Sequence, residues 1–319
     1  MFNLNKIIYT LLIFLLMELG LLAIYSVISE SSSESHSNTK IFKVVNMDKY
    51  KSLPILKIKS PTIKEAEQVK SHTLIKPKRI KSLEDVLVHV SPHRKSDIIS
   101  IQNQMVQPII YTKSIKLTEM SIENKKQTFI NMMIPSILVA KHRIKEERKK
   151  VLKLLRQEHI SKKDDLWLRK KRHIFKASTV HELYERMELH PTSIVIAQAI
   201  IESGWGTSRF FEQANNVFGI WSFNEHEKRI AASKKRGDKT IYLKKYKDVE
   251  QSVSDYFLLL STKDAYKEFR EKRLESQDPF ILIEQLGKYS ELGEAYIENL
   301  KNTIEENQLL AYDSYSLDI

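Results

Sequence analysis

The stretch AQAIIESGWGTSRFFEQANNVFGIW occupies residues 197–221 and places one glutamate, Glu202, directly before two closely spaced glycines. Glycine is scarce elsewhere, with 7 in 319 residues. Upstream of the glutamate, apolar residues recur at helical spacing and Pro191 suits the first turn of a helix. The pattern predicts a helix over 191–203 that ends at Gly204, because glycine readily adopts the backbone conformation just past a helix end.

The position of Glu202 favours acid chemistry. A carboxyl in the last turn of a largely buried helix lies near unpaired carbonyls and the negative end of the helix dipole, which raise its pKa. A carboxyl that keeps its proton near neutral pH can act as a general acid. Gly206 allows a close approach of chain or ligand, and nearby tryptophan and phenylalanine rings offer flat surfaces on which sugars stack. A glutamate that ends an apolar helix can equally be structural, so the pattern alone leaves both readings open.

The combination of ES-x-WG-x-S and NN-x-FG-x-W resembles the core motif of glycoside hydrolase family 73, the bacterial endo-β-N-acetylglucosaminidases, and more narrowly the bacterial Bax-like proteins. The similarity extends upstream through residues 125–144 and downstream to about residue 310. It implies an α+β fold that is mostly helical, with a lysozyme-like catalytic domain and a small β-hairpin lobe on one side of the cleft.

The resemblance also implies roles for individual residues. Glu202 takes the place of the catalytic acid, and Tyr296 in GEAYIENL takes the place of a tyrosine that assists it. A second acidic residue belongs in the hairpin lobe, where Glu225, Glu227 and Asp238 all qualify and the sequence does not choose among them. The candidate substrate-binding residues are Gln198, Trp205, Asn216, Phe218, Gly219 and Trp221. No metal and no dissociable cofactor is expected.

The activity implied by the resemblance is hydrolysis of β-1,4 bonds in peptidoglycan between N-acetylglucosamine and N-acetylmuramic acid. A muramidase or a lytic transglycosylase on the same fold is an alternative. From a different class, a non-catalytic scaffold that binds the cell wall is another. The charge that develops on the sugar is met either by a hairpin carboxylate that guides water or by the 2-acetamido group of the substrate itself.

Local patterns agree with a hairpin followed by helices. Residues 218–223 and 240–246 favour strands, separated by a polar loop that ends in a turn signal at Gly237 and Asp238. Helices are expected downstream over residues 249–261, 263–273, 278–288 and 293–309.

Composition limits the class of protein and its partners. The chain is 42% apolar and 29% charged, which is typical of a folded protein. It has no cysteine, which excludes disulfides and thiolate chemistry. The net charge of +12 points to polyanionic partners, namely nucleic acid, anionic lipid or an anionic wall polymer.

The N-terminal segment favours a membrane and wall location. Residues 7–28 form an apolar run with one acid, Glu18, long enough to cross a bilayer as a helix, and no small-residue cleavage site follows. Lys6 precedes the run and acidic residues follow it, so the positive-inside rule leaves the remaining chain outside the cytoplasm. A nucleic-acid partner is therefore not expected, and the sequence does not specify an oligomeric state.

Two segments lie between the apolar run and the motif. Residues 29–120 show little periodicity, and residues 121–176 are rich in basic side chains. Five prolines and a serine-rich start favour a flexible stalk. Within the basic segment, residues 141–176 contain 15 Lys/Arg and 5 Asp/Glu. This excess of positive charge indicates either a solvated helical face or an attachment site for anionic wall or membrane material. Pro135 is expected to divide its helix or open a second one. Thr179 and Glu182 form a capping-box signal for a helix over 180–188.

The expected organisation is a cytoplasmic N-terminus 1–6, a transmembrane signal anchor 7–28, a stalk 29–120, a basic helical region 121–176, a glucosaminidase domain 177–312 and a tail 313–319.

Overall fold

The computed structural model describes residues 82–233 and 240–319. Within these ranges the protein is a mostly helical α+β fold with three two-stranded sheets. The predicted anchor at 7–28, the stalk up to residue 81 and the turn at Gly237 and Asp238 lie outside the described residues. No helix within the described ranges is long and apolar enough to span a bilayer.

The elements follow one another along the chain as helices with a few short strands. The first part contains α2 (Leu83–Val86), β1 (Val88–Val90), η3 (Lys95–Asp97), β2 (Met105–Val106), β3 (Ile109–Tyr111), α3 (Ile122–Leu155), α4 (Lys162–Phe175), α5 (Val180–Arg186), α6 (Thr192–Ser203) and α7 (Arg209–Ala214). The second part contains β4 (Arg229–Ala231), β5 (Tyr242–Lys244), α8 (Val249–Thr262), η4 (Asp264–Tyr266), α9 (Lys267–Glu275), α10 (Pro279–Ile283), η5 (Glu284–Tyr289), α11 (Glu294–Glu306), η6 (Leu309–Ser314) and β6 (Ser316–Leu317).

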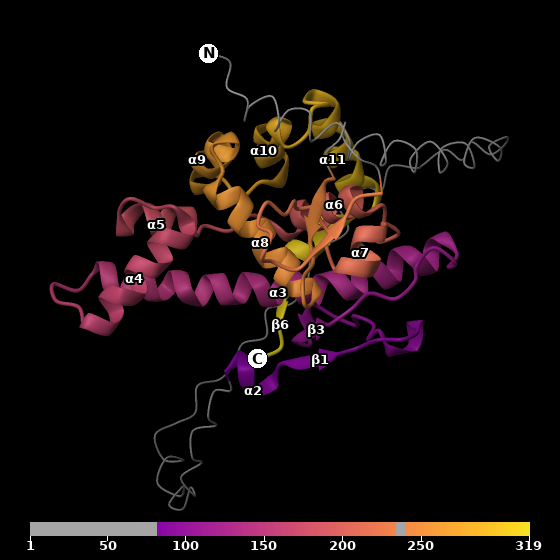
Figure 1. The fold of residues 1–319 in the computed structure, drawn as a ribbon, viewed down its shortest axis with the longest axis horizontal. Coiled ribbons are helices and arrows are strands. Elements are labelled where there is room, and N and C mark those ends of the chain that lie inside the picture. The colour runs from indigo at the N-terminus through magenta and orange to yellow at the C-terminus, as the bar shows by residue number, and fades with distance from the viewer. Residues whose placement is uncertain (1–81, 234–239) are drawn as a thin grey trace, which may run out of the picture.

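Helix α3 is the long axis of the molecule, with most other helices on one side of it and the early strands on the other (Figure 1). Its middle part, residues 128–140, is buried on every face. Pro135 lies inside this stretch and does not divide the helix, so the prediction of a break there was wrong. A proline removes one helical hydrogen bond. The burial of both flanking turns in the same core stabilises the helix enough to continue through it.

Helix α6 is the buried centre of the domain, as its apolar sequence predicts. Residues 192–200 are all buried, and α6 packs against α3, α11 and η6. Its first turn is capped from the other end of the chain, since Asp313 accepts hydrogen bonds from the backbone N–H and the hydroxyl of Ser193, both at 2.7 Å. A carboxylate at a helix N-terminus is favoured by the unpaired N–H groups and the dipole there.

Residues 82–120 belong to the folded domain, which corrects their prediction as part of a stalk. β1 pairs with β3 in parallel, from Val88 opposite Ile109 to Val90 opposite Tyr111. Tyr111 and Leu117 are completely buried in the main core. The prolines and low periodicity that suggested a stalk instead mark short irregular turns laid across the face of α3.

The C-terminal residues are also integrated rather than a free tail. β6 pairs in parallel with β2, with Met105 opposite Ser316 and Val106 opposite Leu317. The side chain of Leu317 lies in the main core. The two ends of the described chain thus lie beside each other below α3 (Figure 1).

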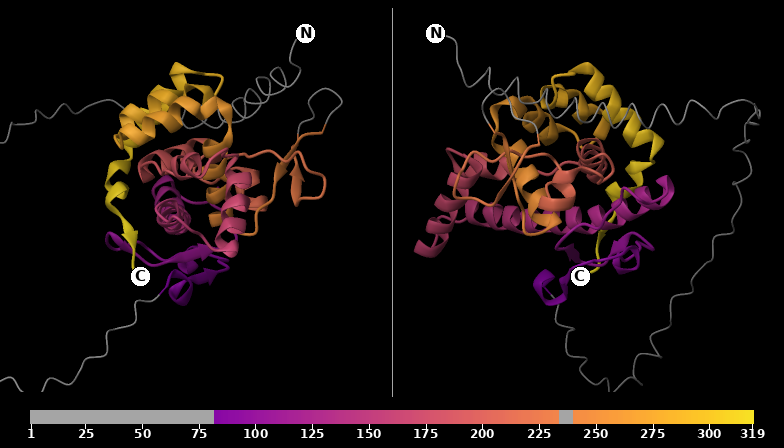
Figure 2. Two further views of the ribbon diagram at one scale, coloured as in Figure 1. Left: turned by 90° about the vertical axis from the view of Figure 1, so that its left-hand side faces the viewer. Right: turned by 45° about the vertical axis from the view of Figure 1, so that its right-hand side comes forward.

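The small lobe is the antiparallel pair β4 and β5, which projects from the helical body (Figure 2). The prediction of a strand over 240–246 agrees with β5, whereas the predicted strand at 218–223 contributes only an isolated bridge between Trp221 and Leu243. The partner of β5 is β4, which lies in the segment predicted as a polar loop. Residues 216–220 turn back on themselves instead of extending, because the Ile220 N–H donates to the side chain of Asn216 at 2.9 Å.

The helices after the hairpin follow the predicted order, some of them in two parts. α8 matches the prediction for 249–261 closely, while η4 with α9, and α10 with η5, divide the next two. The predicted cap at Thr179 is also present: its hydroxyl accepts the Glu182 N–H at 3.0 Å. The Glu182 carboxylate returns one residue earlier than a capping box requires, to the Ser178 N–H at 2.6 Å.

Candidate active site

The site begins at the end of α6. Glu202 lies in the last turn, and Gly204 follows in the left-handed conformation with φ of 56°, as the sequence predicts. The helix therefore ends at Gly204, one turn after its buried residues 192–200. Glu202 itself is half-buried, at the boundary between the core and the surface.

The turn after Glu202 is strained. Gly204, Trp205 and Gly206 all have positive φ, of 56°, 57° and 75°, and a tryptophan rarely adopts that conformation. Several hydrogen bonds hold it: among them, the Trp205 N–H donates to the Ile200 carbonyl at 3.1 Å, and the Gly206 N–H donates to the Ser203 hydroxyl at 2.9 Å. Strain of this kind persists where surrounding structure imposes it and is frequent at functional sites.

Gly206 is required by packing as well as by its backbone angle. A Cβ placed on it would stand 2.7 Å from Phe129, 2.8 Å from Leu117 and 2.9 Å from Phe211, all closer than side chains tolerate. Glycine here allows three buried side chains to close over the turn. The position of Glu202 is thereby fixed by α3, α7 and the segment before α3.

Tyr296 of α11 is brought to Glu202, as the sequence predicts. Its hydroxyl donates a hydrogen bond to Glu202 Oε1 at 3.1 Å. Burial raises the pKa of the Glu202 carboxyl to about 7, while the hydrogen bond from Tyr296 acts in the opposite direction. The site therefore contains a carboxyl that retains much of its proton at neutral pH, next to a hydroxyl that stabilises the ionised form.

Further tyrosines form the wall behind this pair. The rings of Tyr289 and Tyr296 stack with centroids 5.5 Å apart and an interplanar angle of 8°. Tyr266 packs beside Tyr289 at 5.8 Å. Burial raises the pKa of both the Tyr289 and the Tyr296 hydroxyl well above 10, so both stay protonated. Sequence reasoning found only Tyr296, because the other two tyrosines have no motif of their own.

Gln198 is not a substrate contact in this structure, contrary to the prediction. Its side chain is completely buried, and its amide nitrogen donates to the Tyr296 hydroxyl at 3.0 Å. Its amide oxygen accepts from Tyr256 at 2.6 Å. The four-residue spacing places it on the Glu202 side of α6, but one turn deeper in the core.

The NNVFG segment is likewise structural. The Asn216 side chain is buried and bonds to backbone groups of Ile220 and Lys244. Phe218 is buried and stacks on Tyr256 at 4.2 Å, and Gly219 is buried with φ of 63°. These three predicted substrate-binding residues therefore position the hairpin against α8.

The two tryptophans of the motif are partly accessible, and sugar binding by them stays a prediction. Trp205 packs against Phe129 at 6.0 Å, and the Lys126 ammonium lies 4.9 Å from its ring centre. Trp221 stacks with Phe223 at 6.1 Å, and Phe223 is 65% exposed. Sequence reasoning missed Phe223, although its alternation with Trp221 along an extended segment places both rings on one face.

Within the described residues, no hydrogen bond or ion pair links a hairpin carboxylate to Glu202. Glu225 is an exposed side chain that pairs with Arg229 at 3.7 Å. Glu227 lines a different pocket on the α8 side of the hairpin. Asp238 lies outside the described residues. The choice among the three remains as open as the sequence left it.

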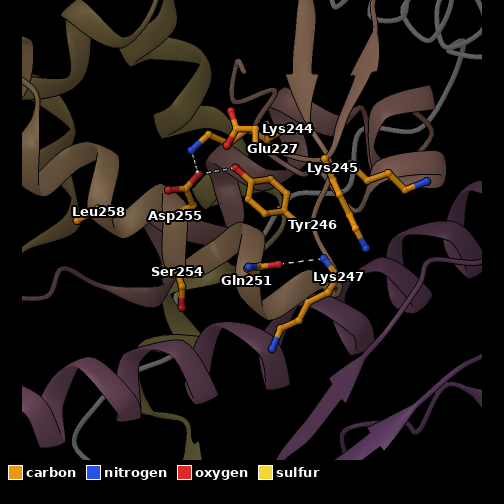
Figure 3. Close-up of a pocket in the computed structure, with 10 residues that line it drawn as sticks. Glu227, Lys244, Lys245, Tyr246, Lys247, Gln251, Ser254, Asp255 and Leu258 are labelled. Carbon is orange, nitrogen blue, oxygen red and sulfur yellow. Dashed lines mark hydrogen bonds and ion pairs between the residues drawn. The ribbon is translucent and has the colours of Figure 1, made fainter. Parts of the chain in front are cut away.

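That pocket has a volume of about 550 Å³, and neither Glu202 nor Tyr296 lines it. Its lining is basic, with side chains of Lys228, Lys244, Lys245 and Lys247 around α8. Figure 3 shows Asp255 on its wall, where it accepts from Lys244 at 2.8 Å and from the Tyr246 hydroxyl at 2.6 Å. Both bonds of Asp255 thus stay within the wall of this pocket.

Residues 177–309, which contain both Glu202 and Tyr296, match the family model described as Glucosaminidase, mannosyl-glycoprotein endo-beta-N-acetylglucosaminidase. The match covers less than half of the chain and includes both residues of the site. Protein bax of Escherichia coli (strain K12) is 34% identical to the chain over 134 residues, which are 40% of this chain and 47% of that protein. Exo-glucosaminidase LytG of Bacillus subtilis (strain 168) is 55% identical over 38 residues, which are 12% of this chain and 13% of LytG. The matched part therefore spans less than half the length of either relative.

Among solved structures, part of the chain is similar to the catalytic domain of the autolysin Auto from Listeria monocytogenes. The sequence identity is 20% and the TM-score is 0.34, with 52% of this chain and 97% of that chain covered.

Proposed function

We propose that this protein is a peptidoglycan hydrolase that cleaves β-1,4 bonds between N-acetylglucosamine and N-acetylmuramic acid, with Glu202 as general acid. One observation carries the proposal: a half-buried carboxyl with a pKa of about 7, bonded to Tyr296, lies inside a glucosaminidase-family domain. A general acid works best when its pKa lies near the working pH.

In the proposed reaction the protonated Glu202 gives its proton to the glycosidic oxygen as the bond to the sugar carbon breaks. The carboxylate that remains is stabilised by the hydrogen bond from Tyr296. The sugar ring takes up positive charge, which the substrate's own acetamido oxygen or a water guided by a hairpin carboxylate then meets. Trp205 and the stacked pair of Trp221 and Phe223 offer partly exposed rings for the sugars.

Analysis of the products decides between this proposal and its alternatives. The full chain is incubated with purified peptidoglycan, and the released fragments are identified by mass spectrometry. Reducing N-acetylglucosamine ends support the proposal. Reducing N-acetylmuramic acid ends indicate a muramidase instead, and anhydro ends a lytic transglycosylase. Fragment length also separates internal cutting from release at chain ends, the mode named for the Bacillus subtilis relative.

The matched control is Glu202→Gln, which keeps the shape of the side chain and cannot donate the proton. General-acid catalysis contributes on the order of 10²–10⁴-fold, so this variant should lose at least about 100-fold in rate. Full activity of Glu202→Gln with an unchanged melting temperature contradicts the role of Glu202. No products from the unsubstituted chain support a non-catalytic wall-binding scaffold.

Single substitutions in the hairpin address the second half of the reaction. If Glu225→Gln, Glu227→Gln or Asp238→Asn is as inactive as Glu202→Gln, that carboxylate activates water. If all three variants retain activity, the substrate's acetamido group supplies the nucleophile.

We also propose that the domain acts outside the cytoplasm, tethered by residues 7–28 as a membrane anchor. The apolar length of that run and Lys6 before it support the proposal. A reporter active only outside the cytoplasm, fused after Ile319, should be active, and a reporter active only in the cytoplasm should be silent. The reverse result contradicts this orientation.

A further inference from the structure

A continuous series of buried hydrogen bonds runs from the core to Glu202. His190 Nε2 and the Tyr256 hydroxyl are 3.0 Å apart, and that hydroxyl lies 2.6 Å from Gln198 Oε1. Gln198 Nε2 lies 3.0 Å from the Tyr296 hydroxyl, which lies 3.1 Å from Glu202 Oε1. The members come from the loop before α6, from α8, from α6 and from α11. None of the first four side chains is more than 2% exposed.

The direction of each bond follows from the single proton that a tyrosine hydroxyl carries. The Gln198 amide nitrogen can only donate, so it donates to Tyr296, whose own proton is then directed to Glu202. The Gln198 amide oxygen can only accept, so Tyr256 donates to it. Tyr256 has no second proton, and its partner His190 therefore donates through Nε2. Every donor in the series points toward Glu202.

The state of His190 agrees with this direction. Burial, assisted by the positive charges of Arg273 and Lys141, lowers the pKa of the imidazole well below 6.5. The ring is therefore neutral and has one N–H, which the series places on Nε2. Its Nδ1 has no hydrogen-bond partner within the described residues, as suits an unprotonated nitrogen in an apolar setting. Aromatic rings of Tyr256, Phe257 and Phe269 surround it.

Resting on the function proposed above, we infer that His190, Tyr256 and Gln198 are positioning residues that decide which oxygen of Glu202 delivers the proton. Because they orient Tyr296 as a donor, Oε1 is always an acceptor, and the proton of the neutral acid resides on Oε2. Oε2 has no hydrogen-bond partner within the described residues. It is also not one of the buried side-chain atoms that lack a partner, so it is accessible from the surface. The proton is thus held on the oxygen that a substrate can reach.

Without the series, the same groups can arrange themselves unproductively. If the Gln198 amide turns over, its oxygen faces Tyr296 and accepts a hydrogen bond from the tyrosine hydroxyl. The neutral Glu202 can then donate its own proton to the Tyr296 oxygen, which withdraws that proton from the substrate. In the present arrangement Tyr256 and His190 together oppose this turn. An inverted amide would donate to the Tyr256 oxygen, the Tyr256 proton would then have to go to His190 Nε2, and the imidazole proton would be left on Nδ1, which has no partner within the described residues.

Within residues 82–233 and 240–319, no charged side chain shifts the pKa of Glu202. The titratable groups that face it are Tyr296 from α11, Tyr256 from α8, Tyr266 from η4 and Tyr289 from η5, and all four are neutral hydroxyls. The charged side chains near the series, Arg273 of α9 and Lys141 of α3, act on His190 at its far end.

Tyr256→Phe in the full chain tests the inference, because it removes one hydroxyl and keeps the ring that stacks on Phe218. Its matched control is Tyr246→Phe, which also removes a buried hydroxyl bond, to Asp255, outside the series. Initial rates on soluble glycan fragments are measured as a function of pH. We expect Tyr256→Phe to lower kcat about 10-fold with KM within twofold, and to move the midpoint of the alkaline limb of kcat/KM to higher pH. Tyr246→Phe should leave kcat, KM and the alkaline midpoint unchanged.

A second comparison shows whether the effect passes through Tyr296. In a Tyr296→Phe background, adding Tyr256→Phe should produce no further shift of the alkaline midpoint, because the donor to Glu202 is already absent. Gln198→Met keeps the volume of the buried side chain and should reproduce the shift of the alkaline midpoint seen with Tyr256→Phe. It replaces Tyr256→Phe in the test if Tyr256→Phe does not fold.

The outcomes are distinct. Tyr256→Phe and Tyr246→Phe with the same kinetics, or a shift that persists in the Tyr296→Phe background, overturns the positioning role. An active Glu202→Gln overturns the proposed function itself, whatever the tyrosine variants do.

Discussion

Tyr296 and Glu202 are joined by a 3.1 Å hydrogen bond between residues 94 positions apart, and this bond opposes the effect of burial on the same carboxyl. Burial favours the neutral acid, and the tyrosine hydroxyl favours the carboxylate. The resulting pKa of about 7 suits a group that must hold a proton before the reaction and release it during the reaction.

The first prediction concerns the pH dependence of activity. In the proposed role Glu202 acts in its protonated form, so kcat/KM should decline as the pH rises through about 7, the pKa of that carboxyl. Tyr296→Phe removes the bond that favours ionisation, so its alkaline midpoint should lie at higher pH, with a smaller loss of rate than in Glu202→Gln. Rate profiles from pH 5 to pH 9 check both. A midpoint that moves downward in Tyr296→Phe contradicts the role of the bond.

The same carboxyl predicts a pH dependence of stability. Its pKa is raised from 4.5 to about 7 on folding, so between these values the folded protein binds more protons than the unfolded chain. The free energy of unfolding contributed by this group is therefore greatest below pH 4.5 and is lost as the pH rises toward 7. The shift corresponds to roughly 3 kcal/mol.

Urea unfolding at several pH values measures this effect by comparison with Glu202→Gln, which does not titrate. The difference in unfolding free energy between the two proteins should change by roughly 2 kcal/mol between pH 5 and pH 7, the part of the full shift that falls in this range. The glutamate protein should lose stability relative to the glutamine variant as the pH rises. A difference that is constant across this range contradicts the raised pKa.

The turn after α6 predicts a large cost for one added methyl group. Gly206→Ala places a Cβ within 3.0 Å of three buried side chains and also strains a backbone with positive φ. Overpacking and the backbone penalty together should lower the free energy of unfolding by about 2–5 kcal/mol. Gly293→Ala is the matched control, because its φ is also positive, at 51°, and its Cβ meets nothing within 4 Å. Its ψ of −113° lies outside the left-handed helical region, so its backbone cost alone should be about 1–3 kcal/mol. Equal losses in the two variants would mean that packing around Gly206 contributes nothing.

The sequence alone could predict the part of the site that local rules determine. The end of α6 at Gly204 follows from the backbone freedom of glycine, and the cap of α5 at Thr179 follows from its hydroxyl. The pairing of Glu202 with Tyr296 came from the resemblance of the motif to a family. No spacing rule connects residues in different helices.

The prediction was wrong where a polar residue of the motif turned out to be internal. Gln198 shares the helix face of Glu202, so its spacing suggested a substrate contact. Whether it reaches the surface depends on Tyr256 and Tyr296, which cover it from α8 and α11. The same applies to Asn216, whose partners are backbone groups of a turn and of β5. Long-range packing of this kind leaves no periodic signal in a single sequence.

The basic region offers a prediction that the structure makes specific. Many of its cations are paired internally, such as Lys150 with Asp164 and Lys171 with Glu147. The exposed lysines of α4 at positions 162, 163 and 170 have no ion pair within the described residues. Charges of this kind attract anionic surfaces and are screened over about 8 Å at physiological salt.

Replacing these three lysines by glutamine should therefore weaken attachment to anionic wall or membrane preparations and reduce its dependence on salt. The control replaces Lys267 and Lys272 of α9 and Lys288 of η5, which changes the net charge equally outside α4. Sedimentation at low and high salt measures bound protein. Equal binding by the two variants, or binding that salt does not affect, contradicts a role for this face.

The last prediction concerns the segment before α3, which its sequence did not reveal as part of the domain. Leu117 is completely buried and lies over Gly206, so it packs directly behind the turn that carries Glu202. Leu117→Ala leaves a cavity there and should lower the free energy of unfolding by about 2–5 kcal/mol. Ile122→Ala, at a position that is 59% exposed, is the control and should cost less than about 1 kcal/mol. Both are measured by urea unfolding of the full chain, and activity is measured below the unfolding transition. If the two variants are equally stable, residues 82–120 do not pack on the domain. If Leu117→Ala is destabilised as expected and also loses activity while folded, the segment supports the turn as well as the core, because the cavity lets the strained backbone at Trp205 relax and displaces Glu202 from Tyr296.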